Sequence, residues 1–145
     1  MKIKNVLRDK ARDAIFSVTS DTTVYEALQL MAEKNIGAVL VIDDGHLSGI
    51  FSERDYARRG ILQGRASQQT IIREVMTSKL ITVSSEQKLE EAMILMSEKH
   101  IRHLPVVDEG KLVGIISIND VVSSIIKDQK ARIESLESYI SGTPY

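Results

Sequence analysis

Two serine–aspartate pairs carry the residue types and spacing that are most suggestive of chemistry. Ser117 and Asp120 follow the apolar run 114–116, and Ser52 and Asp55 repeat the same spacing earlier in the chain. A serine hydroxyl at such a place caps a helix, and a carboxylate in the first turn meets the positive end of the helix dipole. A strand that leads into a helix N-terminus also exposes N–H groups that can hold a phosphate. Each pair is therefore either a capping box without a ligand or part of an anion site, and the duplication favours the second reading.

The two pairs belong to an internal duplication with an offset of 65 residues, which a fold prediction has to take into account first. Each copy predicts the order β-α-β-β-α, with apolar runs for strands and apolar positions at helical spacing for helices. The offset aligns, without a gap, Val18 with Val83, Met31 with Met96, Asp43 with Asp108, Gly45 with Gly110 and Gly49 with Gly114.

The expected elements follow from hydrophobic period and turn signals. Asp21 or a neighbouring hydroxyl is expected to cap the first long helix, and the segment 84–86 its counterpart. The pairs Asp44-Gly45 and Glu109-Gly110 lie in hairpin turns, where glycine supplies a positive φ. Strands are predicted at 15–19, 38–42, 47–51, 80–83, 104–107 and 112–116, and helices at 1–14, 24–34, 52–62, 70–76, 89–99 and from 117 onward. The predicted parts are 1–64, with the N-terminal helix and first repeat, 65–79, with a linker and short helix, and 80–145, with the second repeat and an extended helix.

Composition narrows the function classes. The 145 residues are 43% hydrophobic and 27% charged, and a net charge of -1 gives no electrostatic case for a nucleic acid or an anionic membrane. The absence of cysteine excludes disulfides, thiolate metal sites and a cysteine nucleophile. No apolar run approaches the roughly 20 residues of a membrane helix, and residues 1–6 lack the apolar core of a signal peptide. We therefore expect a cytoplasmic protein.

The last helix continues past the end of the duplication. Ile133, Leu136 and Ile140 extend its apolar positions at spacings of three and four, with charged residues between them. Two interpretations stay open, a helix end that packs back on its own domain and a seam between two copies of the chain.

The duplicated pattern resembles a pair of cystathionine-β-synthase-type (CBS) domains, also called a Bateman module. The resemblance rests on the strand and turn 104–108, its looser copy 40–43, and Gly-x-x-Ser-x-x-Asp twice. It covers about residues 15–126 and implies an α/β fold with two pseudo-symmetric repeats packed sheet to sheet. It further implies a stand-alone regulatory module that binds AMP, ADP, ATP, NAD or S-adenosylmethionine, with AMP favoured, and that acts on an unknown regulated protein as a homodimer.

The resemblance also implies a ligand site in the cleft between the repeats. Asp120 is expected to accept hydrogen bonds from ribose hydroxyls, and Ser117 to donate one to a phosphate. Arg102 and His103 are expected to neutralise the phosphate, since arginine offers forked donors. The apolar walls are expected from Ile115 and Ile116 on one side and from Ile15, Phe16, Ile36, Gly37 and Ala38 on the other.

A second, symmetry-related cleft is expected to bind its ligand less tightly. The counterparts of Arg102 and His103 there are Gly37 and Ala38, so positive charge is missing unless Arg54 replaces it. The residues expected to line this cleft are Ile50, Ser52, Arg54, Asp55, Ile81 and Ile101.

Other chemistry has weaker support. An enzyme acting on a nucleotide, a hydrolase or a fragment related to inosine-monophosphate dehydrogenase, is the alternative function, yet no base lies at an activating spacing from Ser117. His100 and His103 are three residues apart and could meet as metal ligands, but no sulfur or carboxylate group is predicted beside them to complete a metal site. We expect no catalytic cofactor and no metal. A scaffold without ligand is the third possibility.

Overall fold

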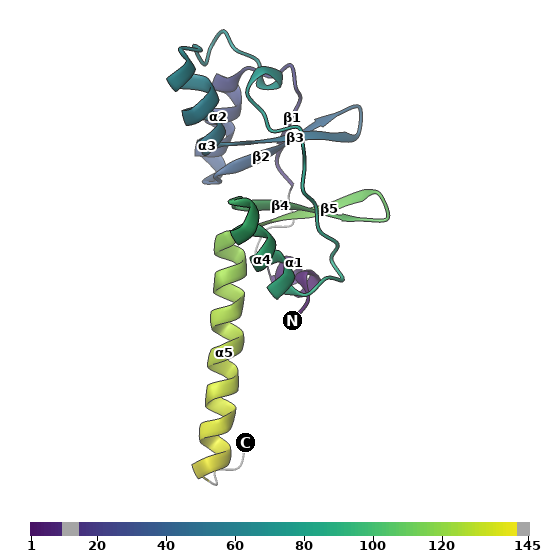
Figure 1. Cartoon of the computed structure of the whole chain (residues 1–145), viewed down its shortest axis with the longest axis vertical. Coiled ribbons are helices and arrows are strands. Elements are labelled where there is room, and N and C mark those ends of the chain that lie inside the picture. Colours follow the sequence, from purple (N-terminus) through teal and green to yellow (C-terminus); the bar gives the residue numbers. More distant parts are fainter. Residues whose placement is uncertain (10–14, 142–145) are drawn as a thin grey trace. The chain divides into compact units, whose positions relative to one another are not determined.

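The computed structural model describes residues 1–9 and 15–141 and shows a mixed α/β chain (Figure 1). The chain divides into two compact units, Ala14–Thr82 and Met1–Asp13 with Val83–Tyr145. The first unit holds the first repeat and the second unit the second repeat, so the predicted duplication is present in the fold. The N-terminal helix lies with the second repeat, and the segment 65–82 lies with the first repeat.

The unit of the first repeat has a three-stranded sheet in the order β1-β2-β3. Strand β1 (Ser17–Val18) runs parallel to β2 (Ala38–Asp43), and β2 runs antiparallel to β3 (His46–Ser52). Helix α2 (Val24–Lys34) has the predicted bounds, and Thr23 caps it by accepting a hydrogen bond from the backbone N–H of Glu26. A hydroxyl of the predicted turn, rather than Asp21, is therefore the cap.

The predicted helix at 52–62 is irregular. It begins as α3 (Glu53–Asp55), continues as a π-helical turn (Tyr56–Gly60) and ends in a 3₁₀ turn (Ile61–Gln63). A Cβ at Gly60 would lie 3.0 Å from the ring of Tyr56, so the tyrosine packs directly on this glycine. Gly64 then ends the segment with a φ of 73°, as the sequence predicted.

The unit of the second repeat repeats the hairpin but not the complete sheet. Strands β4 (His103–Asp108) and β5 (Lys111–Ser117) pair antiparallel. The strand predicted at 80–83 is reduced to one parallel bridge between Val83 and Val106. Helices α4 (Leu89–Lys99) and α5 (Ile118–Ser141) follow the prediction. The predicted cap at 84–86 is wrong, because Lys88 occupies the N-cap position of α4.

Both hairpins use the turn that their sequences predict. The central residues have positive φ in each, 50° at Asp44 with 78° at Gly45 and 50° at Glu109 with 78° at Gly110. Positive φ at both positions defines a type I′ turn, which matches the twist of the flanking strands.

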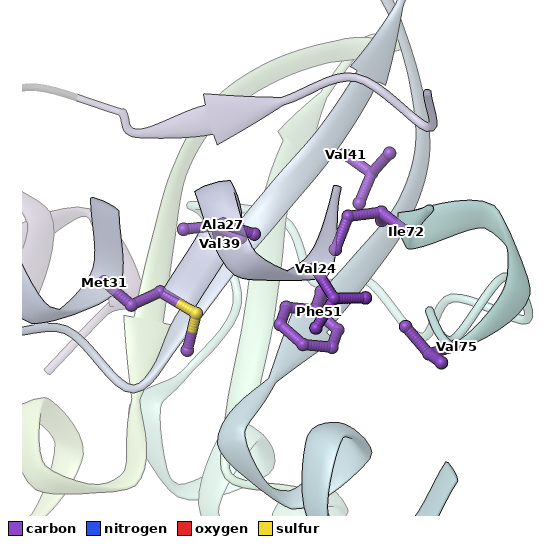
Figure 2. Close-up of a cluster of buried hydrophobic side chains, with 8 residues drawn as sticks. All are labelled: Val24, Ala27, Met31, Val39, Val41, Phe51, Ile72 and Val75. Atoms are coloured by element: carbon purple, nitrogen blue, oxygen red, sulfur yellow. The ribbon is translucent and has the colours of Figure 1, made fainter. Parts of the chain in front are cut away.

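The core of the first unit lies between α2 and the sheet, closed by the 3₁₀ helix Ile72–Glu74. Figure 2 shows Phe51, which is fully buried, beside Val24 of α2. The cluster consists of Val24, Ala27, Met31, Val39, Val41, Phe51, Ile72 and Val75. Burial of such side chains contributes about 1.5–3 kcal/mol each.

Helix α1 (Ile3–Asp9) contributes a buried isoleucine and a backbone hydrogen bond to the second repeat, as the 3₁₀ helix does to the first. The N–H of Ile3 donates to the carbonyl of Gln87 at 3.0 Å, and the N–H of Ile72 donates to the carbonyl of Thr22 at 2.8 Å. Both isoleucines are fully buried. Each repeat is therefore completed by the segment that precedes the other repeat in the sequence. Residues 10–14 of the predicted first helix lie outside the described residues.

Candidate functional site

In the second repeat, β5 delivers Ser117 to the N-terminus of α5. The backbone N–H of Ser117 donates to Oδ2 of Asp120 at 2.8 Å, and the N–H of Asp120 donates to Oγ of Ser117 at 3.1 Å. Both side chains are half-buried. This reciprocal capping fixes the rotamers of a hydroxyl and a carboxylate at the positive end of a helix 24 residues long.

The start of β4 lies beside this helix N-terminus. His103 is the cross-strand partner of Ser117. The N–H of Ile118 donates to the carbonyl of Arg102 at 2.8 Å, which ties the first residue of α5 to the residue before β4. Arg102 is exposed and His103 half-buried. The predicted hydroxyl, carboxylate, arginine and histidine thus come from one local structure.

The first repeat builds the same local structure with different neighbours. The N–H of Ser52 donates to Oδ2 of Asp55 at 3.0 Å, and the N–H of Asp55 donates to Oγ of Ser52 at 3.1 Å. Ala38 pairs across the strands with Ser52, and the N–H of Glu53 donates to the carbonyl of Gly37 at 3.1 Å. Small residues stand where the second repeat has Arg102 and His103.

Thr77 adds a contact in the first repeat that the sequence did not suggest. Its hydroxyl donates to Oδ1 of Asp55 at 3.1 Å, so both carboxylate oxygens of this aspartate accept hydrogen bonds within the unit. Arg59 donates to the carbonyl of Met76 at 3.0 Å and holds the backbone next to Thr77. The motif Ile-x-x-Val-Met before Thr77 resembles the segment from Ile3 to Leu7 at an offset of 69 rather than 65, but it does not indicate the bond to Asp55.

The predicted apolar residues differ in accessibility. Ile115 is half-buried, whereas its neighbour Ile116 is fully buried and faces the core of its unit. On the other predicted wall, Ile15 is exposed, Phe16, Ile36 and Gly37 are half-buried and Ala38 is buried. Of the two β5 residues, only Ile115 is partly accessible.

Phe16 has a cationic neighbour. The Nζ of Lys34 lies 5.4 Å from the centroid of its ring, within the range of a cation–π contact. This contact places a charged amine beside the predicted apolar wall. The amine covers part of the phenyl ring against which a nucleobase would stack.

Each predicted cleft takes its residues from both compact units. Ile15, Phe16, Ile36, Gly37 and Ala38 lie in the unit of the first repeat, and the six other residues of the first set lie in the unit of the second repeat. Ile50, Ser52, Arg54, Asp55 and Ile81 lie in the first unit, and Ile101 in the second. The structure confirms the local geometry within each unit, while a cleft shared by the repeats stays a prediction.

A second pair of equivalent carboxylates has a structural role. Backbone and hydroxyl donors of Ser20 and Ser48 lower the pKa of Asp43, with the backbone N–H of Ser20 as the largest cause. The hydroxyl of Ser85, followed by its backbone N–H, lowers the pKa of Asp108. Each aspartate ends a strand and fixes the chain before the long helix of its repeat.

Within residues 1–9 and 15–141, no group of three or more His, Asp and Glu side chains is arranged to hold a metal ion. His100 caps the C-terminus of α4 with a φ of 55°, and His103 begins β4, so the two do not share a helical turn. Over the same residues, every helix falls short of the length or the apolar character that crossing a bilayer demands.

Comparison with known proteins gives one consistent result. The family model described as "CBS domain" matches residues 4–61 and 72–127. The mitochondrial CBS domain-containing protein CBSX3 of Arabidopsis thaliana is 40% identical over 97% of this chain and 72% of its own length. A solved structure from Burkholderia ambifaria, described as a signal-transduction protein with CBS domains, has a TM-score of 0.86 and 47% identity, covering 89% of this chain and 96% of that one.

One further solved structure contains bound ligands. It is the CBS domain pair of protein MJ0100 in complex with 5′-methylthioadenosine and S-adenosyl-L-methionine. Its TM-score is 0.75 at 26% identity, and the match covers 86% of this chain and 99% of that one.

Proposed function

Because the chain belongs to the CBS domain family, we propose that it is a regulatory module that binds an adenosine-containing ligand between its two repeats. The observation that carries the proposal is the reciprocal pair Ser117 and Asp120 at the N-terminus of α5, directly beside His103. A related CBS pair was crystallised with two adenosine-containing compounds, which supports the same ligand class here.

The chemistry of this site fits a nucleoside phosphate. Asp120 supplies the acceptor that ribose hydroxyls need, and its fixed rotamer lowers the entropy lost on binding. The hydroxyl of Ser117 and the N-terminal end of α5 suit a phosphate. Arg102 adds positive charge, His103 offers a ring N–H donor, and Ile115 offers an apolar surface for the sugar and base.

The first repeat supplies the opposite wall in this proposal, from the residues Ile15, Phe16, Ile36, Gly37 and Ala38. Glycine and alanine there allow a flat base to approach the backbone closely. The symmetry-related cleft, with Ile50, Ser52, Arg54, Asp55, Ile81 and Ile101, binds more weakly. It has Gly37 and Ala38 in place of Arg102 and His103, and Oδ1 of Asp55 already accepts a hydrogen bond from Thr77, so a ligand hydroxyl would share that oxygen.

Regulation follows if the ligand prefers one arrangement of the repeats, since a ligand shifts an equilibrium only by its difference in affinity for the two states. We place AMP first among the ligands, with ATP, NAD and S-adenosylmethionine as competitors. A homodimer in the cytoplasm that contacts a regulated protein completes the proposal. The module acts without catalysis, and sustained turnover of ATP or NAD by the pure protein would contradict this.

A thermal-shift panel tests the ligand class. AMP, ATP, NAD and S-adenosylmethionine are added to wild type, to Asp120→Ala and to Asn119→Ala, a neighbour in the same turn that is exposed. At a ligand concentration 100 times the Kd, linkage predicts about 2.7 kcal/mol of stabilisation for wild type and for Asn119→Ala. Asp120→Ala should lose most of it. Failure of all four compounds to raise the melting temperature of wild type would favour a scaffold without ligand.

A further inference from the structure

Helix α5 carries two apolar faces, and only one of them is used within its own unit. Val121 is fully buried, and the helix contacts α1, α4 and β5 through its N-terminal part. Figure 1 shows its yellow C-terminal half projecting away from the sheet of this unit. The exposed apolar residues of the helix are Val122 at 43%, Ile126 at 53%, Ile133 at 54%, Leu136 at 60%, Tyr139 at 79% and Ile140 at 82%.

Five of these six residues fall on one heptad repeat. The positions 122, 126, 129, 133, 136 and 140 alternate in steps of four and three, which is the a/d spacing of a coiled coil. Gln129 is the single polar residue in this seam, and Tyr139 flanks it. A seam of this period faces a partner helix along its whole length, about 27 Å at 1.5 Å per residue.

The flanking charges complement a second copy of the same helix. With Ile126, Ile133 and Ile140 at a, Arg132 occupies position g and Glu137 the following e position. In a parallel, in-register pair, Arg132 of each helix lies opposite Glu137 of the other, so two interhelical ion pairs form. Arg132 now bridges Asp128 of its own helix at 3.2 Å; the arginine is exposed and the aspartate half-buried, so Arg132 can exchange partners at little cost.

The position of Gln129 selects the parallel orientation. In a parallel pair Gln129 meets Gln129 of the second helix, and the two amides can hydrogen-bond to each other. An antiparallel pair centred between Ile133 and Leu136 would set Gln129 against Ile140 and leave the amide without a partner in the seam. A polar layer of this kind fixes register at a cost in stability.

We propose that residues 122–140 of α5 form a parallel two-stranded coiled coil with the same residues of a second copy of this chain. The inference rests on the homodimer of the proposed function and names its surface, whereas ligand binding at Ser117 and Asp120 is tested separately. The seam is shorter than three heptads, so we expect a dimer that dissociates on dilution.

Sedimentation of the full chain over a range of concentrations tests the proposal. Ile133→Asp should raise the dimer dissociation constant on the order of 100-fold, because it buries a charge in the seam. Ile94→Asp is the matched control, since Ile94 is the same residue, on α4 of the same unit, and equally exposed at 54%. It should leave the dimer intact. A monomeric wild type, or a dimer that Ile94→Asp disrupts and Ile133→Asp does not, would overturn the proposal.

Cross-linking tests the orientation, and the chain has no cysteine to interfere. A single Ile126→Cys should oxidise to a covalent dimer, because facing a positions in a parallel pair bring the two Cα atoms within disulfide range. Ala131→Cys, at position f on the outer side, is the control and should stay monomeric on a non-reducing gel. In the antiparallel pair the two 126 positions lie about 25 Å apart, so absence of the 126 cross-link at dimer-forming concentration would rule out the parallel arrangement.

Discussion

The two repeats build the same serine–aspartate cap and then use it differently. In the first repeat, Asp55 is held on both oxygens by Ser52 and Thr77, and the helix after it ends within ten residues at Gly64. In the second repeat, Ser117 and Asp120 begin an uninterrupted helix of 24 residues beside Arg102 and His103. A duplicated motif therefore fixes the same local geometry in both repeats, while the residues around it differ.

The largest expected effect comes from the segments that complete each repeat. Ile3→Ala and Ile72→Ala each remove a fully buried side chain and should lower the free energy of unfolding by about 2–5 kcal/mol. Amide hydrogen exchange should show that the two variants lose protection in different units. Ile3→Ala should reduce protection mainly in residues 83–141, and Ile72→Ala mainly in residues 15–82. Loss of protection by Ile3→Ala in the first repeat alone would contradict the exchange of segments described here.

The equivalent glycines Gly49 and Gly114 should differ when each is changed to alanine. A Cβ at Gly49 would meet the backbone carbonyl of Thr77 at 2.8 Å, whereas a Cβ at Gly114 would meet Cδ2 of the flexible Leu7 side chain at 2.8 Å. Because backbone yields less than a leucine side chain, Gly49→Ala should cost about 2–3 kcal/mol and Gly114→Ala about 1 kcal/mol. Urea unfolding of the two variants measures the difference, and a larger loss for Gly114→Ala would contradict this packing.

A smaller effect should appear in acid. The pKa values of Asp43 and Asp108 are lowered in the folded chain by serine donors, so both carboxylates bind protons more readily when the chain is unfolded. Their stabilisation is complete above the unfolded pKa, near 3.8, and is lost as the pH falls through the lower folded values. Asp43→Asn and Asp108→Asn should each flatten the pH dependence of the melting temperature below pH 4. An unchanged acid slope in both variants would contradict the assigned role.

Much of the fold was predictable where local signals act alone. The bounds of α2 and α4 follow from apolar spacing, and the hairpins from Asp44-Gly45 and Glu109-Gly110. Prediction was wrong where tertiary contacts decide. The strand expected at 80–83 has one bridge at Val83, and the serines expected to cap α4 bind Asp108 instead.

The local geometry of the candidate site was predictable in part, while the role of its residues in binding stays a prediction. The spacing of Ser117 and Asp120 identified a cap, and the cross-strand position of His103 followed from the hairpin register. The bond from Thr77 to Asp55 was not predictable, because it joins residues 22 apart through a segment whose repeat has a different offset. The burial of Ile116 beside the more accessible Ile115 was also not predictable, because it depends on which face of the strand packs against the core.

The most direct test of the difference between the repeats is calorimetric titration of AMP into Asp120→Ala and Asp55→Ala, with circular dichroism to verify that both variants remain folded. Asp120→Ala should weaken binding by about 10- to 100-fold, because hydrogen bonds to a charged group are worth about 1.5–3 kcal/mol. Asp55→Ala should change the affinity of the tighter site by less than about threefold, since it leaves that carboxylate in place. A larger loss in Asp55→Ala, or equal losses in both, would contradict the assignment of the ligand to the second repeat's aspartate.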